Sequence, residues 1–198
     1  LEDPDTSRED LLRKTDTMIA EVDRMESLVR SLLAVSRGGP PIRRPERIDA
    51  IVEDVLERSR DSARAKRVTL HLTHGSHRDL PLDRTSIEAA VTNIVQNAID
   101  ATDEGGNVWV ATRDDPHSTV VVVSDDGPGI RPDQREKVFE IFWTSKRGGT
   151  GLGLPLARTT VERHGGELEV LDRPGGGSRF VIHLPRLEGH DVTGSAGG

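Results

Sequence analysis

The chain has 198 residues, of which 33% are hydrophobic, and this is enough to bury the core of one ordinary domain with an appendage. Its net charge of −7, without a face-sized basic run, argues against nucleic acid as a main partner, and the absence of cysteine excludes disulfides, thiolate metal sites and cysteine catalysis. No apolar run approaches the ~20 residues that span a bilayer and no signal peptide opens the sequence, so we expect a soluble, cytoplasmic segment without membrane contact, although the full-length protein can still be anchored.

Residues 7–37 carry apolar side chains at steps of three and four between charged positions, which predicts one long amphipathic helix. The stripe is narrow, as in a coiled coil or helical hairpin, and consists of Leu12, Ile19, Val22, Met25, Val29, Leu32 and Leu33. The segment GGPPIRRP at Gly38–Pro45 ends the helix, because glycine and proline both oppose its continuation. We therefore expect a hinge or domain boundary there.

Beyond that boundary the sequence predicts three helices and five strands. The helices are Ile48–Ala65, Ser86–Ala101 and Leu152–His164, and the strands are Val68–Leu72, Val108–Thr112, Thr119–Asp125, Leu168–Leu171 and Arg179–Leu184. Every position from Val120 to Val123 is apolar, which is typical of a strand covered on both faces. These elements predict an α+β fold, a two-layer sandwich in which three helices cover a mixed sheet of about five strands, and the polar, glycine-rich residues 187–198 predict a disordered tail.

Two asparagines lie four residues apart in the predicted helix Ser86–Ala101. Asn93 and Asn97 therefore project from one face of the helix, while the apolar residues between them anchor it in the core. An amide oxygen is a suitable hard ligand for Mg²⁺, which binds through few protein groups plus substrate phosphates. From this segment alone, amides that face solvent or cap the backbone are an equally good interpretation.

The sequence DDGPGI at Asp125–Ile130 directly follows the apolar strand. Gly127 and Gly129 let the backbone bend closely around a flat ligand. A carboxylate at Asp125 can accept a hydrogen bond from an exocyclic amine, which suits adenine. A plain turn explains the same residues, because Asp-Gly and Pro-Gly are common turn pairs.

The polar segment between Arg131 and Thr150 is typical of a mobile cover over a ligand. Phe139 and Phe142 have helical spacing and are expected to pack on the core, and Lys146 is a candidate point charge for a terminal phosphate. The stretch GGTGLGLPLAR at Gly148–Arg158 joins flexible backbone to a helix start, where several N–H groups can bind an anion. A glycine-rich loop that only turns a corner explains this stretch equally well when it is taken alone.

Taken in order, these motifs resemble the N, G1, F and G2 boxes of sensor histidine kinases, whose superfamily includes gyrase B, Hsp90 and MutL. The matching residues are Asn93/Asn97, Asp125-x-Gly127-x-Gly129, Phe139/Phe142 and Gly149-Thr-Gly-Leu-Gly-Leu154. The wording TSKRGGTGLGL is similar to the nitrogen-regulation and sporulation kinases, and GGGSRF at Gly175–Phe180 resembles the last conserved segment of the family. The resemblance extends from about Ile48 to Arg186 and implies an ATP-binding catalytic domain at residues 46–186.

The resemblance also implies roles for individual residues. Asn97 would bind Mg²⁺, Asn93 would lie beside the γ-phosphate with Lys146 as a second catalytic group, and Asp125 would recognise the adenine amine. The implied cofactors are ATP and Mg²⁺. The implied nucleotide-binding set is Asn97, Asp125, Gly127, Gly129, Ile130, Lys146, Gly149, Thr150, Gly151, Leu152, Gly153, Leu154 and Ser178.

One position separates a kinase from a hydrolase. The gyrase and Hsp90 branch carries a glutamate general base four residues before the metal-binding asparagine, and here that position is Asn93, which cannot take a proton from water. The resemblance therefore favours transfer of the γ-phosphoryl group to a histidine, for relay to a response regulator. The alternatives are a serine kinase of the anti-sigma-factor type, an ATP-driven conformational clamp and a degenerate nucleotide-binding scaffold without activity.

The acceptor histidine of the family is missing from its usual context. Histidine kinases place it in a His-Glu-x-x-Asn-Pro-type motif on the first helix of a dimerising hairpin, whereas the first histidine here, His71, falls in a predicted strand. Residues 1–39 resemble the loop and the second helix of that hairpin. We therefore expect that this chain does not phosphorylate itself and that the full-length protein is a homodimer through the hairpin.

Overall fold

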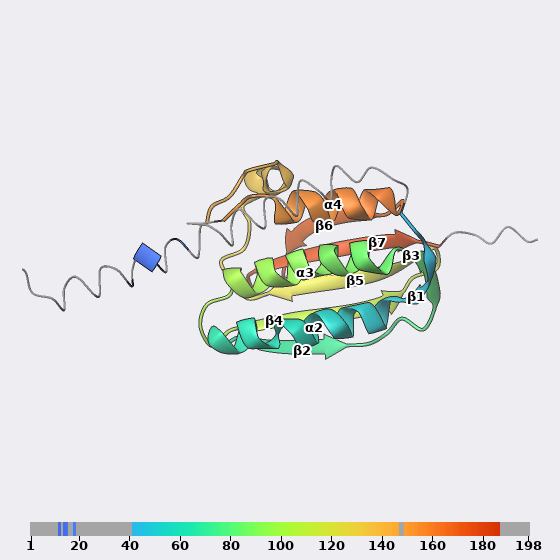
Figure 1. The fold of residues 1–198 in the computed structure, drawn as a ribbon, viewed down its shortest axis with the longest axis horizontal. Coiled ribbons are helices and arrows are strands. Elements are labelled where there is room, and N and C mark those ends of the chain that lie inside the picture. The colour runs from blue at the N-terminus through green and yellow to red at the C-terminus, as the bar shows by residue number, and fades with distance from the viewer. Residues whose placement is uncertain (1–11, 13, 16–17, 19–40, 147–148, 187–198) are drawn as a thin grey trace, which may run out of the picture.

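The computed structural model describes residues 41–146 and 149–186, together with Leu12, Lys14, Thr15 and Met18 (Figure 1). Those four isolated residues are helical, in agreement with the predicted helix at residues 7–37. The rest of that helix and the predicted tail at 187–198 lie outside the described residues. The long helix beyond those four residues and the disordered tail therefore stay predictions.

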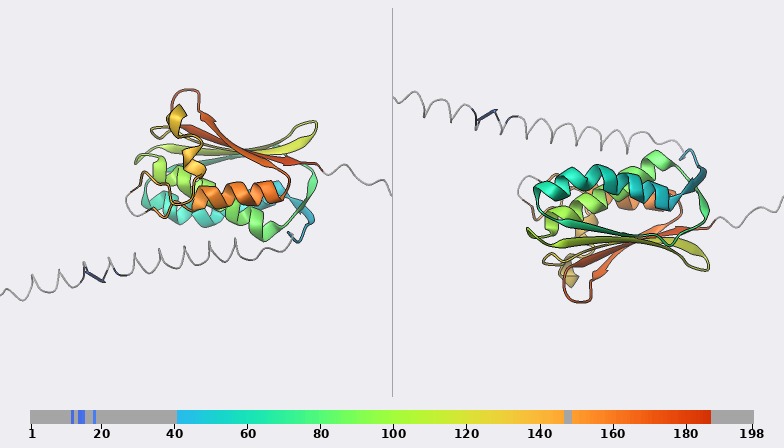
Figure 2. Two further views of the ribbon diagram at one scale, coloured as in Figure 1. Left: turned by 90° about the horizontal axis from the view of Figure 1, so that it is seen from above. Right: turned by 90° about the horizontal axis from the view of Figure 1, so that it is seen from below.

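Five strands form one mixed sheet in the order β2-β4-β5-β7-β6. β2 (Thr69–Thr73) pairs in parallel with β4 (Asn107–Asp114), and β5 (Ser118–Asp125), β7 (Ser178–Pro185) and β6 (Glu167–Asp172) continue the sheet in antiparallel fashion. The helices α2 (Ile48–Ala65), α3 (Arg84–Ala101) and α4 (Gly153–Arg163) cover one face of it (Figure 2). The predicted two-layer α+β sandwich is confirmed, and the ends of its elements differ from prediction by a residue or two.

The central helix α3 owes its position to an apolar stripe on one side. Its buried residues recur at steps of three and four and are Ile87, Ala90, Val91, Ile94, Val95, Ala98 and Ile99. Burial of such side chains contributes roughly 1.5–3 kcal/mol each for the larger ones, so the stripe fixes how the helix is rotated. Asp83 caps the helix, because its carboxylate accepts a hydrogen bond of 3.1 Å from the Ser86 N–H. The rotation leaves Asn93 and Asn97 only partly buried, at the edge of the core.

A second, two-stranded sheet was not predicted. β1 (Arg44–Arg47) pairs antiparallel with β3 (Asp79–Leu82), in a register that places Pro45 opposite Pro81. Proline lacks the N–H that a ladder needs, so a strand that contains it lacks the usual sequence pattern and is confined to edges. The predicted break at Gly38–Pro45 thus overlaps the start of an ordered strand.

The expectation that Val120–Val123 is covered on both faces is confirmed only in part. All three helices lie on the same side of the sheet (Figure 2), yet Val120, which alternation directs to the other side, is fully buried. Val121 and Val123 point into the core beneath the helices, whereas Val122 is only partly buried. On the other face Val122 lies opposite Ala111 and Val181 in the neighbouring strands. Apolar cross-strand neighbours therefore surround Val122, whereas Val120 lies opposite Arg113 and His183.

Buried His164 joins the end of α4 to the start of α3. Its Nδ1–H donates to the Thr160 carbonyl (2.8 Å), and its Nε2 accepts from the Asp83 N–H (3.1 Å). Because Nε2 accepts, the ring is neutral, and burial lowers the pKa of His164 below its ordinary value of 6.5.

We expect protonation of His164 to decrease the free energy of unfolding as the pH is lowered. Below the ordinary histidine pKa of 6.5 the unfolded chain binds a proton at this histidine, whereas the folded chain does not. The contribution of neutral His164 to stability is therefore complete above about pH 6.5 and is lost as the pH falls toward the lower pKa of the folded state. Urea midpoints at about pH 7.5 and about pH 5.5 should differ more for the wild type than for His164→Gln. The exposed His77→Gln should behave like the wild type; parallel pH dependence in all three proteins would contradict the prediction.

Among the residues that the structure describes, none of the helices combines the length and the apolarity that crossing a bilayer requires.

Candidate functional site

A cavity of about 580 Å³ opens between α3, the loop after β5, residues 143–146 and 149–151, and the start of α4. Asn93, Gln96, Asn97 and Asp100 line it from successive turns of α3. Their spacing of three and four residues puts all four on the side of the helix that is turned away from the apolar stripe. The α3 wall of the cavity thus consists of three amides and a carboxylate, with Ala101 at its end.

Most of the residues predicted to bind the nucleotide come together in this cavity. Those that line it are Asn93, Asn97, Gly129, Ile130, Lys146, Gly149, Thr150, Gly151, Gly153, Leu154 and Ser178. Three predicted residues do not line it. Asp125 and Gly127 lie next to it at the end of β5, and the Leu152 side chain is buried instead.

Asp125 is buried at the end of β5, with 1% of its surface exposed. Its Oδ1 accepts hydrogen bonds from the Gly127 N–H (3.0 Å) and the Ser178 N–H (3.3 Å). Its Oδ2 is buried and has no donor among the described residues. Burial raises the pKa of Asp125 because the charged form loses solvation. A buried acceptor without a partner is costly, so this oxygen is suited to a ligand that brings an N–H group, such as the amine of adenine.

We call the predicted cover between Arg131 and Thr150 the lid. The glycine-rich stretch meets the preceding part of the lid at Gly151. The Phe142 N–H donates to the Gly151 carbonyl (2.9 Å), and a side chain at Gly151 would overlap the backbone of Phe142. Gly151 also has φ +65°, a conformation that favours glycine. Glycine at this position therefore allows the two ends of the lid to pack backbone against backbone.

The helix α4 begins directly after this closure and faces α3. A Cβ added to Gly153 would stand 3.6 Å from the Asn93 side chain, so the first turn of α4 lies opposite the amide wall. No side chain caps this helix start, which leaves its first N–H groups available to an anion.

The two lid phenylalanines do not behave alike. Phe139 packs on the core, with the Arg158 guanidinium 4.7 Å from its ring centroid. Phe142 is 68% exposed and has φ +70°. The expectation that both anchor the lid is therefore wrong for Phe142, because the turn that pairs it with Gly151 directs it outward.

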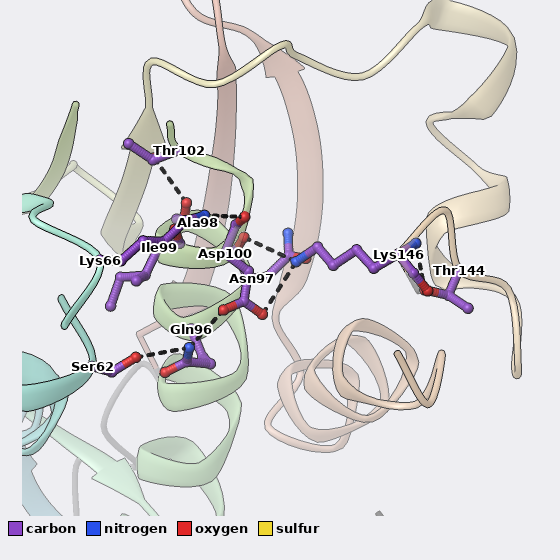
Figure 3. A network of polar contacts seen from close by, with 10 residues as sticks. All are labelled: Ser62, Lys66, Gln96, Asn97, Ala98, Ile99, Asp100, Thr102, Thr144 and Lys146. Carbon is purple, nitrogen blue, oxygen red and sulfur yellow. Dashed lines mark hydrogen bonds and ion pairs between the residues drawn. The ribbon is translucent and has the colours of Figure 1, made fainter. Parts of the chain in front are cut away.

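Lys146 reaches from the lid to α3 (Figure 3). Its Nζ donates to Asn97 Oδ1 (2.9 Å) and to the Asn97 carbonyl (3.3 Å), and it forms an ion pair of 3.4 Å with Asp100 Oδ2. Burial lowers the pKa of Lys146, and Asp100 opposes that shift. The ammonium group therefore contacts the oxygen to which the resemblance to sensor histidine kinases assigns magnesium.

Sequence reasoning missed several polar residues of the cavity, namely Gln96, Asp100, Gln134 and Ser145. For Gln96 and Asp100 the signal was present, because they continue the spacing of Asn93 and Asn97 along one helical face. Gln134 lies in the short 3-10 helix Pro132–Gln134 and Ser145 in a loop, so neither belongs to a periodic pattern that could reveal it.

Comparison with known proteins gives consistent matches. Residues 82–188 match the family of histidine kinase-, DNA gyrase B-, and HSP90-like ATPases. The chain is 34% identical over 193 residues to the alginate biosynthesis sensor protein KinB of Pseudomonas aeruginosa, covering 93% of this chain and 32% of KinB. It is 33% identical over 202 residues to the sensor histidine kinase MtrB of Mycobacterium tuberculosis, covering 93% and 34%. The chain spans about a third of the length of these relatives.

Solved structures agree with these sequence matches. The catalytic domain of histidine kinase ThkA has 29% identity and a TM-score of 0.68, covering 73% of this chain and 95% of that one. ThkA in complex with the response regulator protein TrrA reaches a TM-score of 0.78 at 26% identity, covering 94% and 53%. Full-length ShkA in complex with AMPPNP gives 0.73 at 25% identity, covering 93% and 39%. The chain therefore belongs to the family of histidine kinase-, DNA gyrase B- and HSP90-like ATPases, and the relatives named here confirm the resemblance to sensor histidine kinases.

Proposed function

We propose that this chain binds Mg·ATP in the cavity beside α3 and transfers the γ-phosphoryl group to a histidine on a hairpin helix, for relay to a response regulator. The observation that carries the proposal is Asp125, whose buried Oδ2 has no donor among the described residues and whose other oxygen is held by two backbone N–H groups. An adenine amine would supply the missing donor. The ATPase family match and the AMPPNP bound by ShkA support the same ligand.

The residues present fit a magnesium ion. Asn97 offers a hard amide oxygen at the cavity, Asp100 adds a carboxylate one turn away, and few protein ligands are what Mg²⁺ needs when phosphates supply the others. Bound there, the ion would neutralise charge that develops on the transferring phosphoryl group.

The protein's own groups would do the rest by position. The open start of α4 would hold phosphate oxygens through its N–H groups, and Asn93 would face them from α3. Asn93 has no proton affinity with which to activate water, so the site favours a positioned nucleophile over hydrolysis. We propose the residues predicted from the sequence as this nucleotide site, with residues 46–186 as the catalytic domain.

The partners follow from the same assignment. ThkA forms a complex with the response regulator TrrA, and we propose a response regulator as the partner of this protein too. We also propose that residues 1–39 contribute the second helix of a dimerising hairpin, which would then supply the acceptor histidine from its first helix.

The experiment is phosphotransfer to a hairpin that carries an acceptor histidine and is supplied as a separate chain. With Mg²⁺ and γ-labelled ATP, we expect label on the hairpin that is stable to alkali and labile to acid, and none on this chain alone. Asn97→Ala should lower the rate at least about 100-fold, because it removes the proposed metal ligand. Acid-stable label would point to a serine kinase instead, and release of phosphate without labelled protein would point to a hydrolase.

A further inference from the structure

Lys146 occupies a position that a kinase site would give to a metal ion. Its ammonium group is 2.9 Å from Asn97 Oδ1, the oxygen to which we assign magnesium. The same nitrogen takes the Asn97 carbonyl and the Asp100 carboxylate as further acceptors (Figure 3). Three oxygens around one cation make a small electronegative pocket at the end of α3.

The acceptor side of this contact is fixed. Asp100 Oδ1 accepts a hydrogen bond of 2.8 Å from the amide nitrogen of Gln96, one turn earlier, and the same nitrogen also donates to Ser62 in α2 (3.1 Å). The Asp100 carboxylate that receives Lys146 is therefore braced by α3 and α2, and the Asn97 carbonyl belongs to the backbone of α3.

The donor side belongs to a turn of the lid. The Lys146 N–H donates to Thr144 Oγ1 (3.1 Å), and the Gly149 N–H donates to the Lys146 carbonyl (3.2 Å). The Lys146 side chain remains 36% exposed, so it can leave without opening the core. A partly exposed side chain of the lid thus places its cation on oxygens of α3.

We infer that Lys146 is a displaceable stand-in for magnesium, so that the ammonium group and the metal compete for Asn97 Oδ1 and the arrival of the metal releases Lys146 and the adjoining Thr144 from α3. The inference rests on the proposed function, because it takes the magnesium ligand from it. A second cation on the same ligand oxygen is disfavoured, because like charges at that distance repel each other strongly in a partly buried site. The competition must therefore appear as negative coupling between Lys146 and Mg²⁺.

The competition has a measurable consequence for nucleotide affinity. Without metal, the Lys146 ammonium near the phosphates does part of the work of magnesium, so the wild type should gain only modestly from Mg²⁺. Once the ammonium is removed, binding should depend on the metal much more strongly. The quantity to follow is the ratio of the ADP dissociation constant in EDTA to that in Mg²⁺.

The test is calorimetric titration of the whole chain with ADP, which has no γ-phosphate and allows no turnover. Lys146→Met, which keeps the aliphatic stem, should raise the ratio at least about tenfold over the wild type, within the usual range of coupling between sites. Lys146→Arg, which keeps the charge, should stay within about threefold of the wild type.

Lys66→Met is the matched control. Lys66 also donates to the end of α3, at the carbonyls of Ile99 and Asp100, but it does not touch the Asn97 amide. It should leave the ratio within about twofold, because it removes the same charge from the neighbourhood without vacating the metal ligand. An unchanged or lower ratio for Lys146→Met, or an equal rise for Lys66→Met, would overturn the inference alone. No ADP binding by any of these proteins in either condition would overturn the proposed function, and the inference with it.

Discussion

Asp125→Asn is expected to abolish recognition of adenine nucleotides while leaving the free protein at least as stable as the wild type. The asparagine keeps the shape of the side chain, and its oxygen can still accept from the N–H groups of Gly127 and Ser178. Its NH₂ group then takes the place of the Oδ2 that has no donor among the described residues and faces the adenine amine donor to donor. We expect ADP and ATP affinity to fall at least about 100-fold, since a buried hydrogen bond to a charged acceptor is replaced by an unpaired donor.

The stability of this variant follows from the direction of the pKa shift. Burial raises the pKa of Asp125, which means that folding opposes ionisation of this carboxyl group. Stability is therefore lost as the pH rises from the ordinary pKa of an aspartate to the higher pKa of Asp125 in the folded protein. At neutral pH the buried charge therefore destabilises the free protein. Asparagine removes that charge, and the melting temperature of the free variant should equal or exceed that of the wild type.

The neighbouring Asp126→Asn provides a matched control with the opposite sign. Although burial acts to raise it, hydrogen bonds from Asn107 hold the pKa of Asp126 below its ordinary value. Its ionised form stabilises the fold at neutral pH and this stability is lost as the pH falls through the folded pKa, so Asp126→Asn should melt lower.

Thermal melts of the three proteins with and without Mg·ADP separate the two effects. Asp125→Asn should show no melting shift with nucleotide, whereas Asp126→Asn should keep the shift from a lower starting point. If Asp125→Asn retained the full shift, adenine would have to be recognised elsewhere.

The sequence predicted the layers of the fold because its periodicities are strong. The stripe from Ile87 to Ile99 has one helical interpretation, and it fixes which face of α3 meets the sheet. Once that face is fixed, Asn93 and Asn97 must lie at its margin, so the α3 wall of the site was predictable from a single helix. The β1–β3 ladder was not, because prolines in both strands remove the pattern by which strands are found.

The rest of the site, outside α3, depends on contacts between segments without periodicity. That Asp125 ends a buried strand was visible in the sequence, but its unpaired oxygen depends on which backbone N–H groups reach the other one. The contact of Lys146 with Asn97 joins residues that are 49 positions apart, across a loop whose path no local rule determines. Local propensity predicts which residue types are available, and tertiary packing decides which of them meet.

Gly177→Ala is expected to have the largest effect on folding of any single methyl group added near the site. Gly177 has φ +95°, and a Cβ there would overlap the carbonyl oxygen of Asp125. That carbonyl belongs to the end of β5, between β4 and β7 in the sheet, so it cannot move aside. Overlap with immobile backbone adds to the strain of the left-handed conformation, and we expect a loss of about 4 kcal/mol or more in the free energy of unfolding.

Gly176→Ala separates strain from overlap. Gly176 has φ +101°, and a Cβ there would meet nothing within 4 Å, so only the backbone conformation is penalised. Its cost should be about 1–2 kcal/mol. Urea unfolding followed by circular dichroism should therefore rank the wild type above Gly176→Ala and both well above Gly177→Ala. Equal losses in the two variants would mean that β5 yields at Asp125. The Asp125 carboxylate, which we propose binds the adenine amine, would then rest on a deformable strand end, and Gly177→Ala should keep nucleotide binding. A rigid strand end predicts instead that folding and binding fail together.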